Sequence, residues 1–253
     1  MRIAALYDIH GNLPALEAVL AQVEQTQVDL ILVGGDVASG PMPSQTLDLL
    51  ESLGDRVRFI RGNADRVLDF AGRDDATTVE PWIRSRLWVA KQLGDERLRF
   101  LAGLPVDAVL PVEGIGPVRF CHGSPGSDEE TITGLTGAKR LARLLEGVEE
   151  RVVCCGHTHV QFDRSVDETR IVNAGSVGAP YEARSGAYWL VAGPELAHRR
   201  TPYDLDEAVR RIRATEYPNK DRFAREIALE DPLRPERMTA LIEGLPAPAP
   251  DST

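Results

Sequence analysis

Side chains that bind metal ions or carry protons follow several short apolar segments of this chain. Four of its five histidines lie in such positions, joined by two aspartates and an asparagine. The set is Asp8, His10, Asp36, Asn63, His122, His157 and His159. One histidine at a strand end is most simply a surface residue, but this many at successive strand ends indicate a common site. Imidazole and carboxylate suit Mn, Fe, Zn, Ni or Co better than Mg or Ca, and these side chains are too many for one ion, so a site for two metal ions is predicted.

The apolar segments that precede these residues are expected to be short buried strands. They cover 2–7, 28–33, 56–60, 117–121 and 151–155, and further strands are expected at 169–172 and 186–192. Helical patterns occur at 14–26, 44–53 and 136–146. Strands separated by helices favour a parallel sheet covered on both faces, and ligands bind at the carboxyl ends of its strands. The later strands have little helix between them, which predicts a second, mixed sheet packed against the first.

The segment 66–116 is predicted to form a helical cap beside the site, because its first part is polar and helical without a clean strand. Within it, Trp82, Trp88 and Arg84 have two interpretations. They stack on a base or bind phosphate, or, more simply, the tryptophans pack the cap helix onto the core. Together with a mostly helical region at 203–245, the cap belongs to one predicted domain over residues 1–245, and 246–253 is expected to be a disordered tail.

Composition excludes several classes of protein. The chain has 253 residues, of which 43% are hydrophobic, and a net charge of −10. An acidic surface repels polyanions, so general nucleic-acid binding is not expected, and phosphate compounds would need metal ions or a few placed arginines. No apolar stretch is long enough to span a membrane, and no signal-peptide pattern is seen. Three cysteines without disulfide spacing favour the cytoplasm.

Five sequence blocks together resemble the calcineurin-like metallophosphoesterase family. They are DIH at 8–10, GGD at 34–36, RGNAD at 61–65, CHGS at 121–124 and GHTH at 156–159. All five occur in the family's order, and NAGSVGAP at 173–180 resembles a turn of its smaller bacterial and archaeal members. The resemblance implies an α/β fold of two packed mixed β-sheets flanked by helices, with a binuclear metal site at the strand ends.

The resemblance also implies a role for each site residue. Asp8, His10 and His159 would hold one ion, Asn63, His122 and His157 would hold the other, and Asp36 would bridge both. A hydroxide shared by two divalent transition-metal ions, with Mn preferred, would attack a small phosphate ester. The catalytic group would comprise Asp36, Asn63, Asp65 and His122. Asn12 would support a ligand or cap the helix that follows it.

One position departs from the family pattern. Ala64 stands where phosphomonoesterases and protein phosphatases of the family have a histidine that is thought to protonate the leaving oxygen. Members with a small residue there include phosphodiesterases and a retromer subunit that acts as a scaffold. We therefore predict a phosphodiesterase. The alternatives are a phosphomonoesterase in which Asp65 or water supplies the proton, and a non-catalytic metal-binding scaffold.

Overall fold

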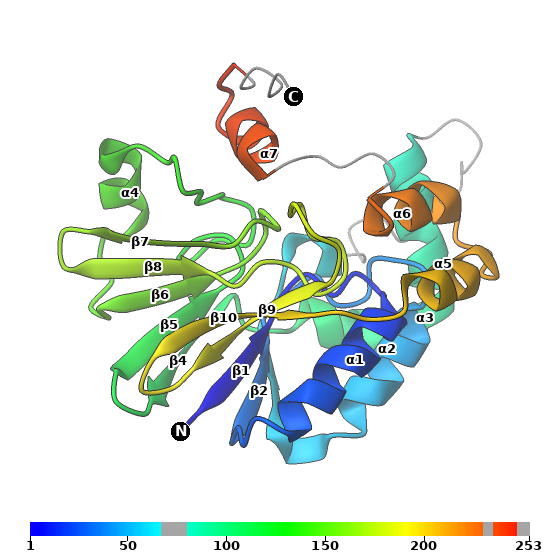
Figure 1. Cartoon of the computed structure of the whole chain (residues 1–253), viewed down its shortest axis with the longest axis horizontal. Coiled ribbons are helices and arrows are strands. Elements are labelled where there is room, and N and C mark those ends of the chain that lie inside the picture. The colour runs from blue at the N-terminus through cyan, green and yellow to red at the C-terminus, as the bar shows by residue number, and fades with distance from the viewer. Residues whose placement is uncertain (67–79, 230–234, 247–253) are drawn as a thin grey trace.

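Two five-stranded β-sheets form the centre of the fold in the computed structural model, which describes residues 1–66, 80–229 and 235–246 (Figure 1). The strands of the first sheet are β1 (Ile3–Leu6), β2 (Leu30–Val33), β3 (Val57–Phe59), β9 (Ala187–Ala192) and β10 (Leu196–Thr201). Those of the second are β4 (Asp107–Val112), β5 (Gly116–Cys121), β6 (Val152–Cys155), β7 (Phe162–Val166) and β8 (Thr169–Asn173). Their orders are β10-β9-β1-β2-β3 and β4-β5-β6-β8-β7.

Three strands of each sheet run parallel to one another and bring their loops to one edge of that sheet. In the first sheet β1 pairs in parallel with β2, and β2 with β3. In the second sheet β5 pairs in parallel with β6, and β6 with β8. The remaining strands, β10, β9, β4 and β7, pair antiparallel. The carboxyl ends of parallel strands are where ligands bind in such folds.

Successive side chains of β1 point into two different apolar cores, one on each face of the first sheet. Ile3 and Ala5 belong to the cluster that fills the space between the two sheets. Ala4 and Leu6 belong to the cluster that joins the first sheet to its helices. All four are fully buried, because successive side chains of a strand point to opposite faces and both faces are covered.

Helices cover the outer face of each sheet (Figure 1). Beside the first sheet lie α1 (Leu13–Glu24), α2 (Pro43–Glu51), α3 (Pro81–Ala102), α5 (Leu205–Arg213) and α6 (Lys220–Ile227). The short α4 (Ala138–Leu144) packs on the second sheet, where its Leu141 contacts a cluster that includes Cys121 and Cys155. The last helix is α7 (Pro235–Ile242). No helix in these described ranges is both long and apolar enough to cross a membrane.

The predicted fold class is confirmed, but one part of the predicted cap is not. Within 66–116, Pro81–Ala102 form the predicted helix, α3, whereas Asp107–Val112 form a strand of the second sheet. This strand lies at the sheet edge, with Ala108, Leu110 and Val112 packed toward the core. Val109 and Pro111 on its other face are exposed yet apolar, so the sequence lacks a clean alternation. Pro111 is tolerated there because an edge strand has one unpaired side. Residues 67–79 of the cap, and the predicted tail from 247 on, lie outside the described residues.

Candidate metal centre

The loops after the strands turn sharply through left-handed backbone. Among the described residues, eight that are not glycine have positive φ, and five of them are predicted metal ligands. The five are Asp8 (φ 53°), His10 (48°), Asp36 (54°), His157 (66°) and His159 (59°). Such conformations cost about 1–3 kcal/mol each and tend to be kept at functional sites. The strained backbone of these five residues is therefore a sign of a functional site in these loops.

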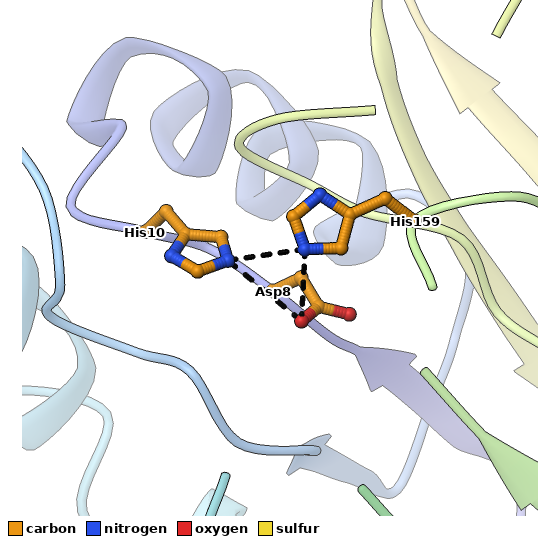
Figure 2. A group of neighbouring side chains, drawn as sticks. All are labelled: Asp8, His10 and His159. Atoms are coloured by element: carbon orange, nitrogen blue, oxygen red, sulfur yellow. Dashed lines mark hydrogen bonds and ion pairs between the residues drawn. The ribbon is translucent and has the colours of Figure 1, made fainter. Parts of the chain in front are cut away.

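The first group of ligand atoms comprises Asp8, His10 and His159 (Figure 2). Oδ1 of Asp8 lies 3.3 Å from Nε2 of His159 and 3.8 Å from Nε2 of His10. The two imidazole nitrogens are 3.1 Å apart. One carboxylate oxygen and two ring nitrogens thus converge on one point, which is the arrangement that a divalent transition metal requires.

The second group comprises Asp36, His122 and His157, whose ligand atoms lie within 4.8 Å of one another. Oδ1 of Asp36 is 3.5 Å from Nε2 of His122 in its own group. Oδ2 of the same carboxylate is 3.6 Å from Nε2 of His10 in the first group. Asp36 therefore faces both groups, one oxygen toward each. The structure brings all predicted ligands to one place, including Asn63, which lines the same cavity as Asp36 and His157.

Each of the four imidazoles is oriented by a backbone carbonyl. The hydrogen bonds join His10 Nδ1 to Ser39 O (3.3 Å), His122 Nδ1 to Gly34 O (2.9 Å), His159 Nδ1 to Ala179 O (2.6 Å) and His157 Nε2 to Glu129 O (3.1 Å). Metal-binding histidines characteristically donate their second ring N–H in this way, which fixes the tautomer and the ring orientation. The other nitrogen of each ring is left to bind a cation.

Three buried polar atoms of the site have no hydrogen-bond partner among the described residues. They are Oδ1 of Asp8, Oδ1 of Asn63 and Nε2 of His122. Buried polar atoms in folded proteins are almost always paired, so three unpaired ones in a single site require an explanation. All three are atoms through which the predicted ligands would bind metal, and their lone pairs fit that role.

The electrostatics of the site also favour cations. Burial alone would lower the pKa of His122, but the carboxylates of Asp36 and Asp8 raise it to about 10. Burial likewise opposes the charged form of His159, yet Asp8 raises the pKa of that imidazole above its usual value. Burial would raise the pKa of Asp36, but His122, His10 and His157 hold it below its usual range. The carboxylates thus stabilise positive charge in a buried place.

Metal binding should release protons, because imidazole must be neutral to act as a ligand. The pKa of His122, raised to about 10, means that this ring carries a proton near pH 7 before a metal binds. We expect about one proton or more to be released at pH 7, and metal affinity to rise with pH. Calorimetry in buffers of different ionisation enthalpy measures the number. Release close to zero would contradict the ligand assignment of His122.

Asp65, considered above as a proton donor, accepts hydrogen bonds from three backbone N–H groups. Its Oδ2 accepts the backbone N–H of Asp36 (2.8 Å) and of Gly62 (2.9 Å), and its Oδ1 accepts that of Val37 (2.9 Å). Burial and the charge of Asp36 raise the pKa of Asp65 to about 7, while the bonds from Gly62 and Val37 favour the ionised form. This buried carboxylate ties together the loops after β2 and β3.

The segment 173–180 supports the loop of Asp8, a role that the sequence alone did not assign. Ser176 Oγ donates to the carbonyl oxygen of Asp8 (2.8 Å), and the Gly178 N–H donates to the same oxygen (3.0 Å). A Cβ on Gly178 would lie 1.8 Å from the carbonyl oxygen of Ile9, so only glycine fits. Of the two roles considered for Asn12, the structure shows the helix cap, because Oδ1 accepts the Ala15 N–H of α1, while Nδ2 donates to the Gly178 carbonyl (2.8 Å).

A cavity of about 450 Å³ opens over the two groups. It is lined by His10, Asp36, Ser39, Asn63, Ala64, Trp82, Ser85, Arg86, His157, His159, Tyr217 and Asn219. The cap helix α3 and the connection between α5 and α6 therefore reach the site. Trp88 packs edge-on against Tyr217, as the packing interpretation predicts. Trp82 instead lines the cavity and is 51% exposed. Arg86, rather than Arg84, is the arginine of the lining.

Two known proteins resemble this chain in sequence. An uncharacterised protein of Methanocaldococcus jannaschii is 26% identical over 235 residues, covering 83% of this chain and 91% of its own. A symmetrical bis(5′-nucleosyl)-tetraphosphatase of Pectobacterium carotovorum is 35% identical over 96 residues, but only 30% of this chain and 34% of that protein are matched.

Solved structures show the same fold. A metallophosphoesterase of Sphaerobacter thermophilus aligns with a TM-score of 0.72 at 24% identity, covering 90% of this chain and 99% of its own. A hypothetical protein of Pyrococcus horikoshii aligns with a TM-score of 0.75 at 20% identity, covering 89% and 97%. Residues 1–192, which carry every ligand described above, match the calcineurin-like phosphoesterase superfamily domain, and the chain therefore belongs to this family.

Proposed function

We propose that this chain is a binuclear metal-dependent phosphoric ester hydrolase that prefers phosphodiesters. The observation that carries the proposal is the position of Asp36, whose two oxygens lie 3.5 Å and 3.6 Å from imidazole nitrogens of the two groups. A carboxylate has two oxygens and can span a pair of metal ions about 3.5–4 Å apart. Asp36 is thus the residue of the site best placed to bind both.

The remaining candidate ligands are assigned to the two ions according to the two groups of side chains described above. Asp8, His10 and His159 would hold one ion, and Asn63, His122 and His157 would hold the other. When bound, two divalent ions, with Mn preferred over Fe, Zn, Ni or Co, would lower the pKa of a shared water and neutralise charge on the phosphoryl oxygens. The surrounding carbonyls hold the imidazoles in place for this, and Asp65 holds the loop of Asp36 against the loop of Asn63.

The preference for diesters rests on Ala64, which lines the cavity and has no proton to give. Asp65 does not replace the missing acid in this proposal, because both its oxygens accept backbone N–H groups. A phosphomonoesterase would then depend on water as the acid and remains the alternative enzyme. A non-catalytic scaffold is less favoured, because binding a partner does not require a complete set of ligands that converges on two points.

The substrate is proposed to be a small phosphate ester. The partial match to the tetraphosphatase supports a nucleotide-containing compound, although about a third of that protein is matched. The net charge of −10 disfavours a nucleic acid. A reducing, cytoplasmic location agrees with Cys121, Cys154 and Cys155, which are buried and unpaired.

Hydrolysis of model esters tests the proposal. Mn²⁺-loaded protein is expected to hydrolyse bis(p-nitrophenyl) phosphate faster than p-nitrophenyl phosphate. A chelator should abolish both activities, and added Mn²⁺ should restore them, because the ions would activate the attacking water and neutralise the phosphoryl oxygens. Turnover that survives thorough metal removal would refute the two-metal mechanism, and a faster rate on the monoester would favour the phosphomonoesterase.

A further inference from the structure

One side of the cavity is built from helices rather than from the metal-binding loops. We call it the helical wall, and it consists of Trp82, Ser85, Arg86, Tyr217 and Asn219. Its two parts are 134 residues apart in sequence and are joined by a hydrogen bond of 2.7 Å from Asn219 Nδ2 to Ser85 Oγ. The wall is therefore assembled by the fold, and it faces the same space as the metal ligands.

Trp82 is the most exposed aromatic side chain of the wall, at 51%. The guanidinium carbon of Arg86 lies 5.4 Å from the centre of its ring, within the range of a cation–π contact. An indole offers a flat apolar surface, and a guanidinium beside it adds a permanent positive charge. Among the described residues that line the cavity, Arg86 is the only lysine or arginine.

We propose that the helical wall binds a planar aromatic substituent of the phosphate ester, a nucleobase above all, with Trp82 stacked on that ring. This inference rests on the proposed function, because it assumes that the phosphate occupies the metal centre. Aromatic side chains serve as stacking surfaces for bases of any sequence, since every base has a π-face. Arg86 supplies positive charge for an anionic substrate on a protein whose net charge is −10.

The size of the cavity agrees with such a ligand. Pockets for small organic ligands are typically 300–1,000 Å³ and combine apolar or aromatic surface with a few polar groups. The cavity of about 450 Å³ has this composition, with the indole of Trp82 and the paired polar side chains of Ser85 and Asn219 in one lining. Ring stacking would select the organic group of the ester, while the metal ligands select its phosphate.

The test compares the binding of adenosine 5′-monophosphate and ribose 5-phosphate to the Mn²⁺-loaded full chain by calorimetry. The two ligands share the phosphate and the sugar and differ only in the base. Wild-type protein should bind the nucleotide about 5- to 150-fold more tightly, the range that corresponds to removing an aromatic side chain from under a base. Trp82→Ala should erase this difference by weakening nucleotide binding alone, and Trp82→Phe should retain most of it. Phenyl phosphate as a third ligand shows whether a simple ring suffices or a base is required.

Phe100→Ala is the matched control, because Phe100 is another exposed aromatic residue of α3, at 40%, and does not line the cavity. It should leave both affinities unchanged. Equal binding of the two ligands to wild-type protein, or a nucleotide preference that survives Trp82→Ala, would overturn the inference. Failure of the proposed function gives a different result, since the base preference would persist while no phosphodiester was hydrolysed.

Discussion

Asp36→Asn is expected to lower kcat/KM for a phosphodiester by on the order of 10³-fold or more, because metal ions contribute several kcal/mol of transition-state stabilisation. The carboxylate lies between the two groups, with Oδ1 near His122 and Oδ2 near His10. An amide keeps one oxygen, which can still accept the Ala64 N–H now bound to Oδ1 at 2.8 Å. Its NH₂ group cannot bind a cation, and the negative charge shared by the two ions is lost. Metal content by mass spectrometry should fall together with activity.

The fold should survive this change, because the backbone N–H of Asp36 remains bonded to Asp65. The metal-free variant should therefore still unfold cooperatively, at a lower Tm than metal-free wild type because the interaction of Asp36 with His122 is lost. Asp163→Asn is the matched control, since this carboxylate pairs with Arg170 in the second sheet at 2.9 Å and 2.6 Å and belongs to neither ligand group. Two bound ions and normal turnover in Asp36→Asn would show that the bridging assignment is wrong.

Ala64→His is expected to raise turnover of alkyl monoesters by about 10²-fold or more, the lower end of the range for general acid catalysis. Alkyl alcohols are poor leaving groups and need a proton, whereas nitrophenol does not. Ala64 lines the cavity, which leaves space beside its Cβ for an imidazole. The backbone contact to Asp36 does not depend on the side chain, so the substitution should preserve the ligand groups.

A series of esters with leaving groups of different pKa measures this effect. The wild-type rate should fall steeply as the leaving group becomes more basic, and Ala64→His should flatten that dependence. Ala64→Gln, which is similar in size but has no titratable proton, controls for the change in volume. A wild-type enzyme that is already indifferent to the leaving group would mean that another group supplies the proton.

The candidate ligands could be predicted from sequence because each follows a buried strand. Parallel strands bring their carboxyl ends together, so this pattern was enough to place Asp8 and Asp36 at one edge of the first sheet. His122 follows β5 in the second sheet, and the packing of the two sheets brings it to them. The division into two groups agrees with the family pattern. A second, mixed sheet was predicted because the later strands have little helix between them, and β5, β6 and β8 do form one. The last of those strands, β9, was assigned wrongly, because it pairs with β1 in the first sheet.

Contacts between segments far apart in the sequence could not be predicted in this way. Asp65 accepts N–H groups from residues 28 and 29 positions away, which no local pattern indicates. The helical wall depends on Asn219 meeting Ser85 across 134 residues. Strand β4 was missed because its exposed face carries Val109 and Pro111, so apolar residues do not alternate with polar ones along it. Local periodicity therefore predicted the ligands, and tertiary packing decided what surrounds them.

Anomalous scattering from a crystal of the Mn²⁺-loaded protein locates the metal ions among their candidate ligands. We expect two peaks, one bound by Asp8, His10 and His159 and the other by Asn63, His122 and His157. Asp36 should contact both through different oxygens. A single peak, or two peaks with Asp36 bound to only one of them, would contradict this expectation.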